Sequence, residues 1–329
     1  MTCFYAFNGD ADGLCALQQL RLADAATGKG TMPTGGETLV TGVKRDIALL
    51  ERVKGGPGDT CTVLDVSLDV NRTGLLALLE AGVSVRYFDH HFAGEIPQHP
   101  RLEAHIDPDA KVCSSIIVDR HLGGRFRAWA AVGAFGDSLT EQGQRLCQEM
   151  GLAPEAAKRL ADLGVAINYN DYGESIADLH VPPTDLAAEM LRYPDPLEFA
   201  AKSVTYQRLA KGFGEDMELA RRLEPARKAP GAIVFELPDA PWARRCSGTL
   251  ANDLAKAHAG NALAIVSRKS DGGYLVSLRV PADSRVSAEG FCRRYPTGGG
   301  RKTAAGINHL PTENLEAFKT AFEEQFRVS

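Results

Sequence analysis

The chain carries a carboxylate and two imidazoles side by side in Asp89-His90-His91, directly after the apolar run Val83–Phe88. Burying such polar groups at the end of a strand costs free energy unless something binds them. Aspartate oxygens and neutral histidine nitrogens together suit manganese and similar divalent ions. The triplet therefore indicates one wall of a metal site.

Acidic residues recur in similar contexts, in Asn8-x-Asp10-x-Asp12-Gly13, at Asp65 and at Asp137. Each could by itself be a helix cap or a turn residue, because aspartate is favoured there. The first motif is not a typical calcium loop, since its twelfth position is glutamine and a strand-like run precedes it. Recurrence after several apolar runs favours one shared site. Two divalent ions about 3.5–4 Å apart can stabilise both oxygens of an in-line phosphoryl displacement, so we expect cleavage of phosphate esters.

A second motif lies near the C-terminus, where three glycines and two basic residues follow Thr297. It is not a nucleotide-binding P-loop, because no glycine immediately precedes Lys302 and no strand-like run comes before it. Glycines let the backbone N–H groups approach an anion, and arginine can add a bidentate phosphate contact. The alternatives are a flexible hairpin and, for Arg279, an ordinary exposed strand residue. The candidate substrate-binding residues are Arg279, Gly298, Gly299, Gly300 and Arg301.

Strands and helices alternate in the first half of the chain and would position the acidic residues. We expect strands at Cys3–Phe7, Thr38–Val43, Thr60–Leu64 and Val83–Phe88, and helices at Leu14–Ala26 and Val70–Ala81. This order predicts an α/β fold, with a parallel sheet flanked by helices. Ligands bind at the carboxyl ends of the strands in such sheets. Asp10, Asp65 and Asp89 all fall at such ends.

The second half changes character along the chain. Residues 111–210 have a mainly helical pattern, and Pro225–Gly231 resembles a domain edge. Beyond it, we expect a smaller α+β domain with strands at Ala232–Leu237, Ala262–Val266 and Tyr274–Val280, and helices at Gly248–His258, Arg285–Arg294 and Leu315–Phe326. The predicted domains are a catalytic domain at 1–185, a helical linker at 186–230 and a substrate-binding domain at 231–329.

Composition narrows the class of protein. A chain of 329 residues fits two domains, and its net charge of −5 favours a small anionic substrate over a long nucleic acid. No apolar run reaches the length that a membrane span needs, and no secretory signal is visible, so we expect a cytoplasmic protein. The seven cysteines form no Cys-x-x-Cys pair, which argues against a zinc knuckle. The oligomeric state stays open, with a homodimer among the options.

These motifs together resemble the DHH phosphoesterase superfamily, named for the triplet Asp89-His90-His91. The resemblance covers essentially the whole chain. The first half is similar to the catalytic DHH domain, and the last third to the DHH-associated domain with its Gly-Gly-Gly-His/Arg and Ala-Ala-Gly loop. Members include single-strand exonucleases, oligoribonucleases that also dephosphorylate 3′-phosphoadenosine 5′-phosphate, cyclic-dinucleotide phosphodiesterases and polyphosphatases. The resemblance implies an active site in the cleft between the two domains.

The resemblance also implies roles for individual residues. Manganese would bind as one or two ions, with magnesium as an alternative, and Asp65 would bridge two ions. His91, with Asp89, would act in catalysis by contacting the scissile phosphate or the attacking water. Arg279 and the loop at residues 298–301 would hold the rest of the substrate. The implied metal ligands are Asp10, Asp12, Asp65, His90 and Asp137.

The chain departs from the family pattern in two places. Ala6 stands four residues before the first aspartate, where many members carry a metal-binding histidine, and Arg301 stands where histidine is common. Our leading hypothesis is a manganese-dependent phosphoesterase acting on a small nucleotide or a short oligonucleotide. The alternatives are a polyphosphate hydrolase and a catalytically weakened nucleotide-binding regulatory protein.

Overall fold

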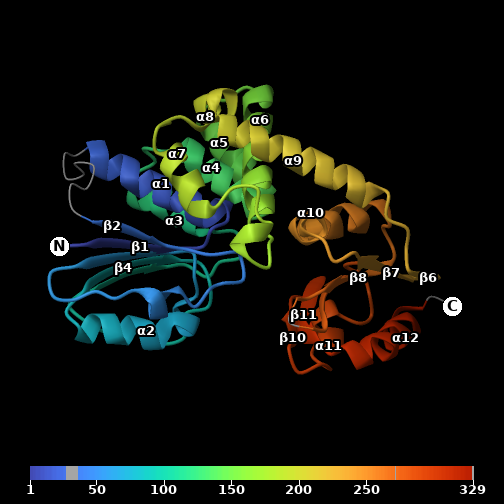
Figure 1. Cartoon of the computed structure of the whole chain (residues 1–329). Coiled ribbons are helices and arrows are strands. Elements are labelled where there is room, and N and C mark those ends of the chain that lie inside the picture. The colour runs from blue at the N-terminus through green and yellow to red at the C-terminus, as the bar shows by residue number, and fades with distance from the viewer. Residues whose placement is uncertain (27–35, 271, 328–329) are drawn as a thin grey trace. The chain divides into compact units, whose positions relative to one another are not determined.

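The structure is a computed structural model that describes residues 1–26, 36–270 and 272–327 (Figure 1). The chain divides into two compact units. Unit 1 comprises Met1–Asp171 and Leu179–Lys211, and unit 2 comprises Tyr172–Asp178 and Gly212–Ser329. Within the described ranges, no helix is long and apolar enough to cross a membrane. All seven cysteines lie in the described part of the chain and are free thiols.

The described part of unit 1 is built on a five-stranded parallel sheet in the order β2-β1-β3-β4-β5. Its strands are β1 (Cys3–Phe7), β2 (Glu37–Val40), β3 (Thr60–Leu64), β4 (Ser84–Asp89) and β5 (Leu102–Ile106). Phe7 pairs with Leu64, and Leu64 pairs with Phe88. The three central strands therefore end level with one another, so the residues that follow them meet at one edge of the sheet.

Helices cover both faces of this sheet: α2 lies on one face, and α1 and α3 lie on the other (Figure 1). A buried apolar cluster fills each side, one around Leu75 and Tyr87 and a larger one around Leu14 and Trp129. The helices are α1 (Ala11–Ala26), α2 (Leu68–Glu80), α3 (Ser114–His121), α4 (Arg127–Gly136), α5 (Thr140–Glu149), α6 (Pro154–Asn170), α7 (Pro183–Met190), α8 (Pro196–Lys202) and α9 (Val204–Arg221).

A close approach of α1, α4 and α6 depends on glycine. A Cβ atom on Gly136 would lie 2.3 Å from the Cβ of Ala11 and 2.9 Å from the carbonyl oxygen of Gly164. Real side chains do not tolerate such distances, so only glycine lets these helices pack this closely. The contact stands next to Asp12 in α1 and Asp137 at the end of α4. It therefore draws two of the predicted ligands towards each other.

Unit 2 is an α+β structure with a six-stranded sheet, among its described residues, in the order β10-β11-β9-β8-β7-β6. Phenylalanines from α11 and α12 pack in its core, as in the edge-to-face contact between Phe291 and Phe322. Its strands are β6 (Arg227–Ala229), β7 (Ala232–Leu237), β8 (Ala262–Arg268), β9 (Tyr274–Arg279), β10 (Gly298–Gly300) and β11 (Ala304–Leu310). Its helices are α10 (Pro241–Ala257), α11 (Ala288–Cys292) and α12 (Leu315–Phe326).

The predicted α/β class is confirmed, and so are the strands at Cys3–Phe7, Thr60–Leu64 and Ala232–Leu237. One description was wrong: Gly298–Gly300 is a strand, β10, and not a loop. We also missed β5, β6 and β11. The predicted linker, 186–230, contains most of α7 and all of α8 and α9, and the border between the two compact units falls within α9. The functional division of the chain stays a prediction.

Candidate active site

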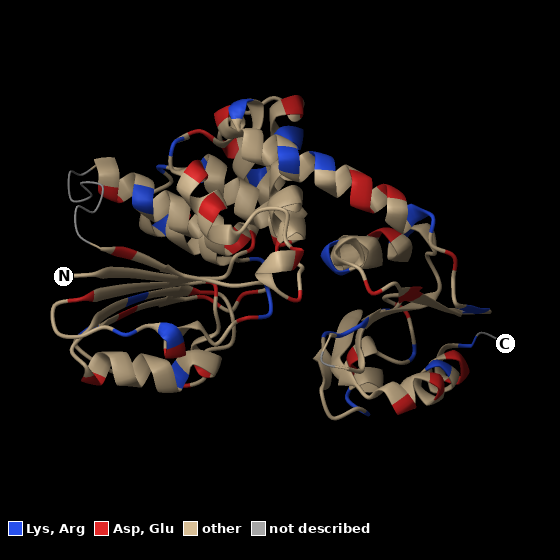
Figure 2. Cartoon of the chain, in the orientation of Figure 1, with Lys and Arg blue, Asp and Glu red and all other residues tan. Residues whose placement is uncertain are grey.

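The acidic and histidine residues predicted from the sequence gather at the carboxyl edge of the unit 1 sheet. Asp10 follows β1, Asp65 follows β3, and Asp89 ends β4 with His90 and His91 behind it. Figure 2 shows acidic segments where these strands end. The structure thus brings together residues from four distant stretches of chain, since Asp137 at the end of α4 joins them.

Asp10 and Asp12 are held by backbone N–H groups. Oδ1 of Asp10 accepts hydrogen bonds from the N–H groups of Asp12, at 3.0 Å, and Gly13, at 3.1 Å. Asp10 is therefore the N-cap of α1, as the simpler interpretation proposed, but only through one oxygen. Asp12 accepts from the N–H groups of Ser114, at 2.6 Å, and Ser115, at 2.8 Å, at the start of α3. These contacts fix both carboxylates before anything binds.

Asp65 adopts a left-handed backbone conformation, with φ of 59°. This conformation is strained for a residue with a Cβ, and its presence at a site usually reflects a functional constraint. Oδ1 of Asp65 accepts a hydrogen bond from the Ser114 hydroxyl at 3.1 Å. Ser138, next to Asp137, has φ of 64°. One strained non-glycine residue thus belongs to the cluster, and another lies next to it in the chain.

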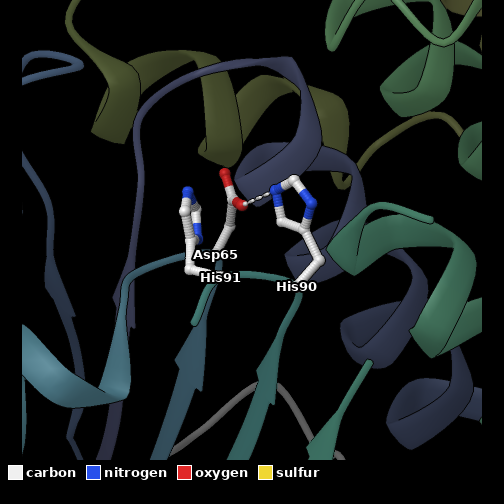
Figure 3. Close-up of side chains that lie close together, drawn as sticks. All are labelled: Asp65, His90 and His91. Atoms are coloured by element: carbon white, nitrogen blue, oxygen red, sulfur yellow. Dashed lines mark ion pairs between the residues drawn. The ribbon is translucent and has the colours of Figure 1, made fainter. Parts of the chain in front are cut away.

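His90 lies between two of the carboxylates. Its Nε2 atom is 3.4 Å from Oδ1 of Asp65 and 3.9 Å from Oδ2 of Asp137. Figure 3 shows the carboxylate of Asp65 between the imidazoles of His90 and His91, and one ligand atom from each of these three residues lies within 4.8 Å of the others. The site therefore offers nitrogen and oxygen ligands at close range.

His91 is oriented by a buried carboxylate. Its Nδ1 atom lies 2.7 Å from Oδ1 of Asp89, which is fully buried. Burial opposes a charge on the imidazole, but the hydrogen bond and negative charge of Asp89 outweigh it and raise the pKa of His91. The side chain of His91 remains 45% exposed. It can therefore reach a bound molecule while Asp89 fixes the ring.

Several carboxylates lie close together at this edge of the sheet, and their negative charges repel one another. Burial, with the nearby charges of Asp10, Asp12 and Asp137, raises the pKa of Asp65 well above its ordinary value. Burial and Asp12 raise the pKa of Asp137 to about 6. Like charges this close favour a bound cation, which would relieve the repulsion.

Three residues beside the cluster were not among the predicted site residues. The ammonium group of Lys44 contacts Oδ2 of Asp10 and donates to Oδ1 of Asn168 at 3.1 Å. Asp171, at the end of α6, is fully buried, and neither carboxylate oxygen has a hydrogen-bond partner in the described part of the chain. Burial and the charge of Asp10 raise the pKa of Asp171 well above its ordinary value. A lone lysine in a loop and a helix-end aspartate carry no sequence signal of their own.

A divalent ion fits the donor set around His90. Neighbouring ligand atoms of an octahedral ion lie about 3 Å apart, since each bond is about 2.1 Å long. The separation of 3.4 Å between His90 and Asp65 needs only a small adjustment to reach that geometry. Mixed carboxylate and imidazole ligands suit manganese, and the carboxylate oxygens also suit magnesium.

In unit 2, Arg279 and Arg301 lie at one end of the sheet. Arg279 ends β9 and pairs with Ala304, whose carbonyl oxygen accepts a hydrogen bond from the Arg301 N–H at 2.8 Å. The Arg279 side chain donates from Nε to Asn252 at 3.2 Å. Burial lowers the pKa of Arg279. The two arginines thus lie close together along the backbone, and their role in substrate binding stays a prediction.

The glycines of β10 take part in strand pairing and close packing, which the sequence did not predict. They pair with β11, with Gly299 opposite Gly306. A Cβ on Gly298 would lie 1.8 Å from the carbonyl oxygen of Cys292, so this glycine allows β10 to pack on α11. A Cβ on Gly299 would meet nothing within 4 Å. Anion binding by this segment stays a prediction.

A second group of possible ligands, Glu103, His105 and His121, lies at the edge strand β5 and the end of α3. His105 stacks on Phe88 with ring centroids 4.6 Å apart, and its Nε2 lies 2.6 Å from Oε1 of Glu103. Packing on Phe88 and the contact with Glu103 account for the position of the His105 ring.

Several solved structures, one of them of a DHH domain, resemble this chain along its whole length. The DHH domain of a protein assigned to a family of ribosomal proteins matches with a TM-score of 0.65 and 12% identity, over 99% of this chain and 87% of the other. Exonuclease RecJ bound to manganese matches with a TM-score of 0.56 and 21% identity, over 98% and 89%. The pGpG-specific phosphodiesterase PggH from Vibrio cholerae matches with a TM-score of 0.52 and 12% identity, over 99% of both chains.

No protein-family model and no curated protein matches the chain. The structural matches nevertheless establish the architecture: the chain has the fold of the DHH superfamily, as its sequence motifs implied. At these identities the likeness concerns the fold alone. Activity has to be argued from the side chains.

Proposed function

We propose that the chain is a divalent-metal-dependent phosphoesterase that hydrolyses phosphodiester or phosphomonoester bonds of small nucleotides or short oligonucleotides. The observation that carries the proposal is the cluster of His90 with Asp65 and Asp137 at the carboxyl edge of a parallel sheet. Manganese is the metal we favour, because the donor set mixes carboxylates and an imidazole and because the similar RecJ structure is bound to manganese. The proposed ligands come from Asp10, Asp12, Asp65, His90 and Asp137.

A divalent ion bound there would supply an activated water and neutralise charge on the phosphoryl oxygens. The chain's own residues supply the rest. Backbone N–H groups at the start of α1 and α3 hold Asp10 and Asp12 in place. His91, oriented by Asp89, can donate a hydrogen bond to a phosphoryl oxygen or receive a proton from the attacking water. Such preorganised groups need little rearrangement during the reaction.

We assign substrate contacts in unit 2 to Arg279 and Arg301, with the backbone of Gly298–Gly300 close by. An arginine recognises phosphate oxygens through two parallel N–H bonds. We expect Arg301→Ala to raise KM more than it lowers kcat, because Arg301 would bind the substrate equally in the ground state and the transition state. If kcat and kcat/KM fell by the same factor, Arg301 would instead act only in the transition state of the chemical step.

The proposal is tested by incubating the purified protein and manganese with dinucleotides, cyclic dinucleotides, 3′-phosphoadenosine 5′-phosphate, polyphosphate and single-stranded DNA. Turnover of a nucleotide substrate that is lost in Asp65→Ala supports it. Hydrolysis of polyphosphate alone would replace it with that alternative.

A nucleotide-binding regulatory protein is the second candidate, and the contact between Lys44 and Asp10 favours it. That contact occupies a carboxylate oxygen that a catalytic ion could use. Binding of a nucleotide without turnover of any substrate in the panel would support this hypothesis and reject the enzyme.

A further inference from the structure

Lys44 reaches the site from the loop after β2 and is held there by several groups. Its backbone N–H donates to the carbonyl oxygen of Asp171 at 3.1 Å. Its ammonium group contacts Oδ2 of Asp10 and donates to Oδ1 of Asn168 at 3.1 Å. The side chain is only 23% exposed. The ammonium group is thus held within the cluster rather than extended into solvent.

Asp10 has little capacity left for a metal ion. Its Oδ1 atom already accepts two backbone N–H groups, from Asp12 and Gly13. Its Oδ2 atom is the oxygen that Lys44 contacts. A divalent ion on Asp10 would have to displace an ammonium group or approach it closely, and either course costs free energy because both are cations.

The chain next to Asp10 offers little to hold such an ion. Ala6, four residues earlier, is fully buried and its side chain has no donor atom. Asp171 is also fully buried, and its two carboxylate oxygens have no hydrogen-bond partner in the described part of the chain, but the charge of Lys44 acts on this carboxylate as well, so an ion there would meet the same ammonium group. By contrast, Nε2 of His90 lies 3.4 Å from a carboxylate oxygen of Asp65 and 3.9 Å from one of Asp137, so His90 faces both carboxylates. The cluster therefore offers metal ligands around His90, whereas the ammonium group of Lys44 occupies the position beside Asp10.

We infer that the site holds a single divalent ion, on Asp65, His90 and Asp137, and that the ammonium group of Lys44 takes the place beside Asp10 that a second ion would need. The inference rests on the metal site of the proposed function. Lys44 neutralises Asp10 permanently, because an ammonium group on the chain cannot dissociate as an ion can. It also places a positive charge beside the position where a phosphoryl group would meet the metal.

Counting bound manganese tests this directly. Titration of the purified full-length chain with Mn²⁺, followed by the electron paramagnetic resonance signal of free Mn²⁺, should give one tightly bound ion per chain. Two ions of similar affinity would overturn the inference, and the proposed function would stand if turnover were intact. No bound ion would overturn the inference together with the metal site on which it rests.

Variants of Lys44 then test the role of the ammonium group. Lys44→Ala should bind a second Mn²⁺, because Oδ2 of Asp10 becomes free, whereas Lys44→Arg should keep one ion. Lys44→Met serves as a second neutral variant should the alanine protein fail to fold. Lys54→Ala, which removes an exposed ammonium group outside the cluster, is the control and should keep one ion. A count of one in folded Lys44→Ala or Lys44→Met would contradict the inference.

Discussion

Nδ1 of His91 lies 2.7 Å from Oδ1 of Asp89, whose carboxylate is wholly buried behind the ring. Asp89 therefore acts through His91, as a positioning residue. We expect Asp89→Asn to lower kcat by about 10- to 100-fold, as for other residues that orient a functional histidine. An amide keeps the shape of the side chain but loses the charge that favours the protonated imidazole. Steady-state kinetics with the substrate found in the panel would measure the loss.

The control for Asp89→Asn is the manganese count. Asp89 is not among the proposed ligands, so the number of ions bound should equal that of the wild-type protein. A variant that loses both turnover and manganese would show that Asp89 supports the metal site as a whole.

Asp65 has a strained backbone conformation and lies at the centre of the cluster. Replacing it should therefore raise stability and abolish activity. Its φ of 59° is costly for a residue with a side chain, and its carboxylate is buried among like charges. Asp65→Gly should therefore abolish turnover and metal binding. It should raise the free energy of unfolding by about 1 kcal/mol, because glycine adopts this conformation without strain. Urea denaturation without added metal measures the stability.

A loss of stability in Asp65→Gly would mean that the hydrogen bond from Ser114 contributes more than the strain and repulsion cost. Turnover that survives Asp65→Ala would come from a contaminant or from another site.

Gly136 is predicted to hold the helices that carry two candidate ligands. Gly136→Ala would force a Cβ to within 2.3 Å of Ala11. The helices must then separate, at a cost of about 1–3 kcal/mol, as in other overpacked cores. Gly214→Ala in α9 is the matched control, because a Cβ there meets nothing within 4 Å. That variant should stabilise the protein by about 0.5–1 kcal/mol. Equal effects of the two changes would argue against close packing at Gly136.

The sequence predicted the parts of the site that depend on strand ends. Asp10, Asp65 and Asp89 each follow a strongly apolar run, and parallel pairing brings such ends together without further information. The sequence could not predict the contact between Lys44 and Asp10. Lys44 lies in a loop whose path depends on tertiary packing, and a single lysine has no periodic pattern.

The glycines at residues 298–300 illustrate a different limit. Three glycines indicated an anion-binding loop because glycine lets the backbone N–H groups approach an anion closely. Here they form β10, since β11 pairs with them and since Gly298 packs against the carbonyl oxygen of Cys292. Close backbone contact can thus require glycine as strongly as an anion site does.

The short segment Tyr172–Asp178 is tied to the rest of unit 2 by a charged contact that should be visible in the pH dependence of stability. Asp178 accepts hydrogen bonds from Nε and Nη2 of Arg244, at 3.0 and 2.8 Å, and from the N–H of Glu174, at 2.8 Å. Burial opposes ionisation of this carboxyl, but Arg244 and the backbone donor outweigh it and hold the pKa of Asp178 below its ordinary value.

A folded-state pKa below the unfolded one stabilises the protein at any pH above the unfolded value, and this contribution is lost as the pH falls through the folded value. Asp178→Asn should therefore lower the free energy of unfolding near neutral pH by about 1–3 kcal/mol, as expected for hydrogen bonds to a charged group. The difference from wild type should shrink once the pH is below about 4, where the unfolded carboxyl is protonated.

Asp239→Asn removes the other partner of Arg244, at 2.6 Å, but that carboxylate is 56% exposed. Exposed pairs contribute about 0–1 kcal/mol, so this control should change stability less. Urea denaturation of both variants at neutral and acidic pH measures the effect, and a difference for Asp178→Asn that is independent of pH would mean that shape rather than charge makes Asp178 important.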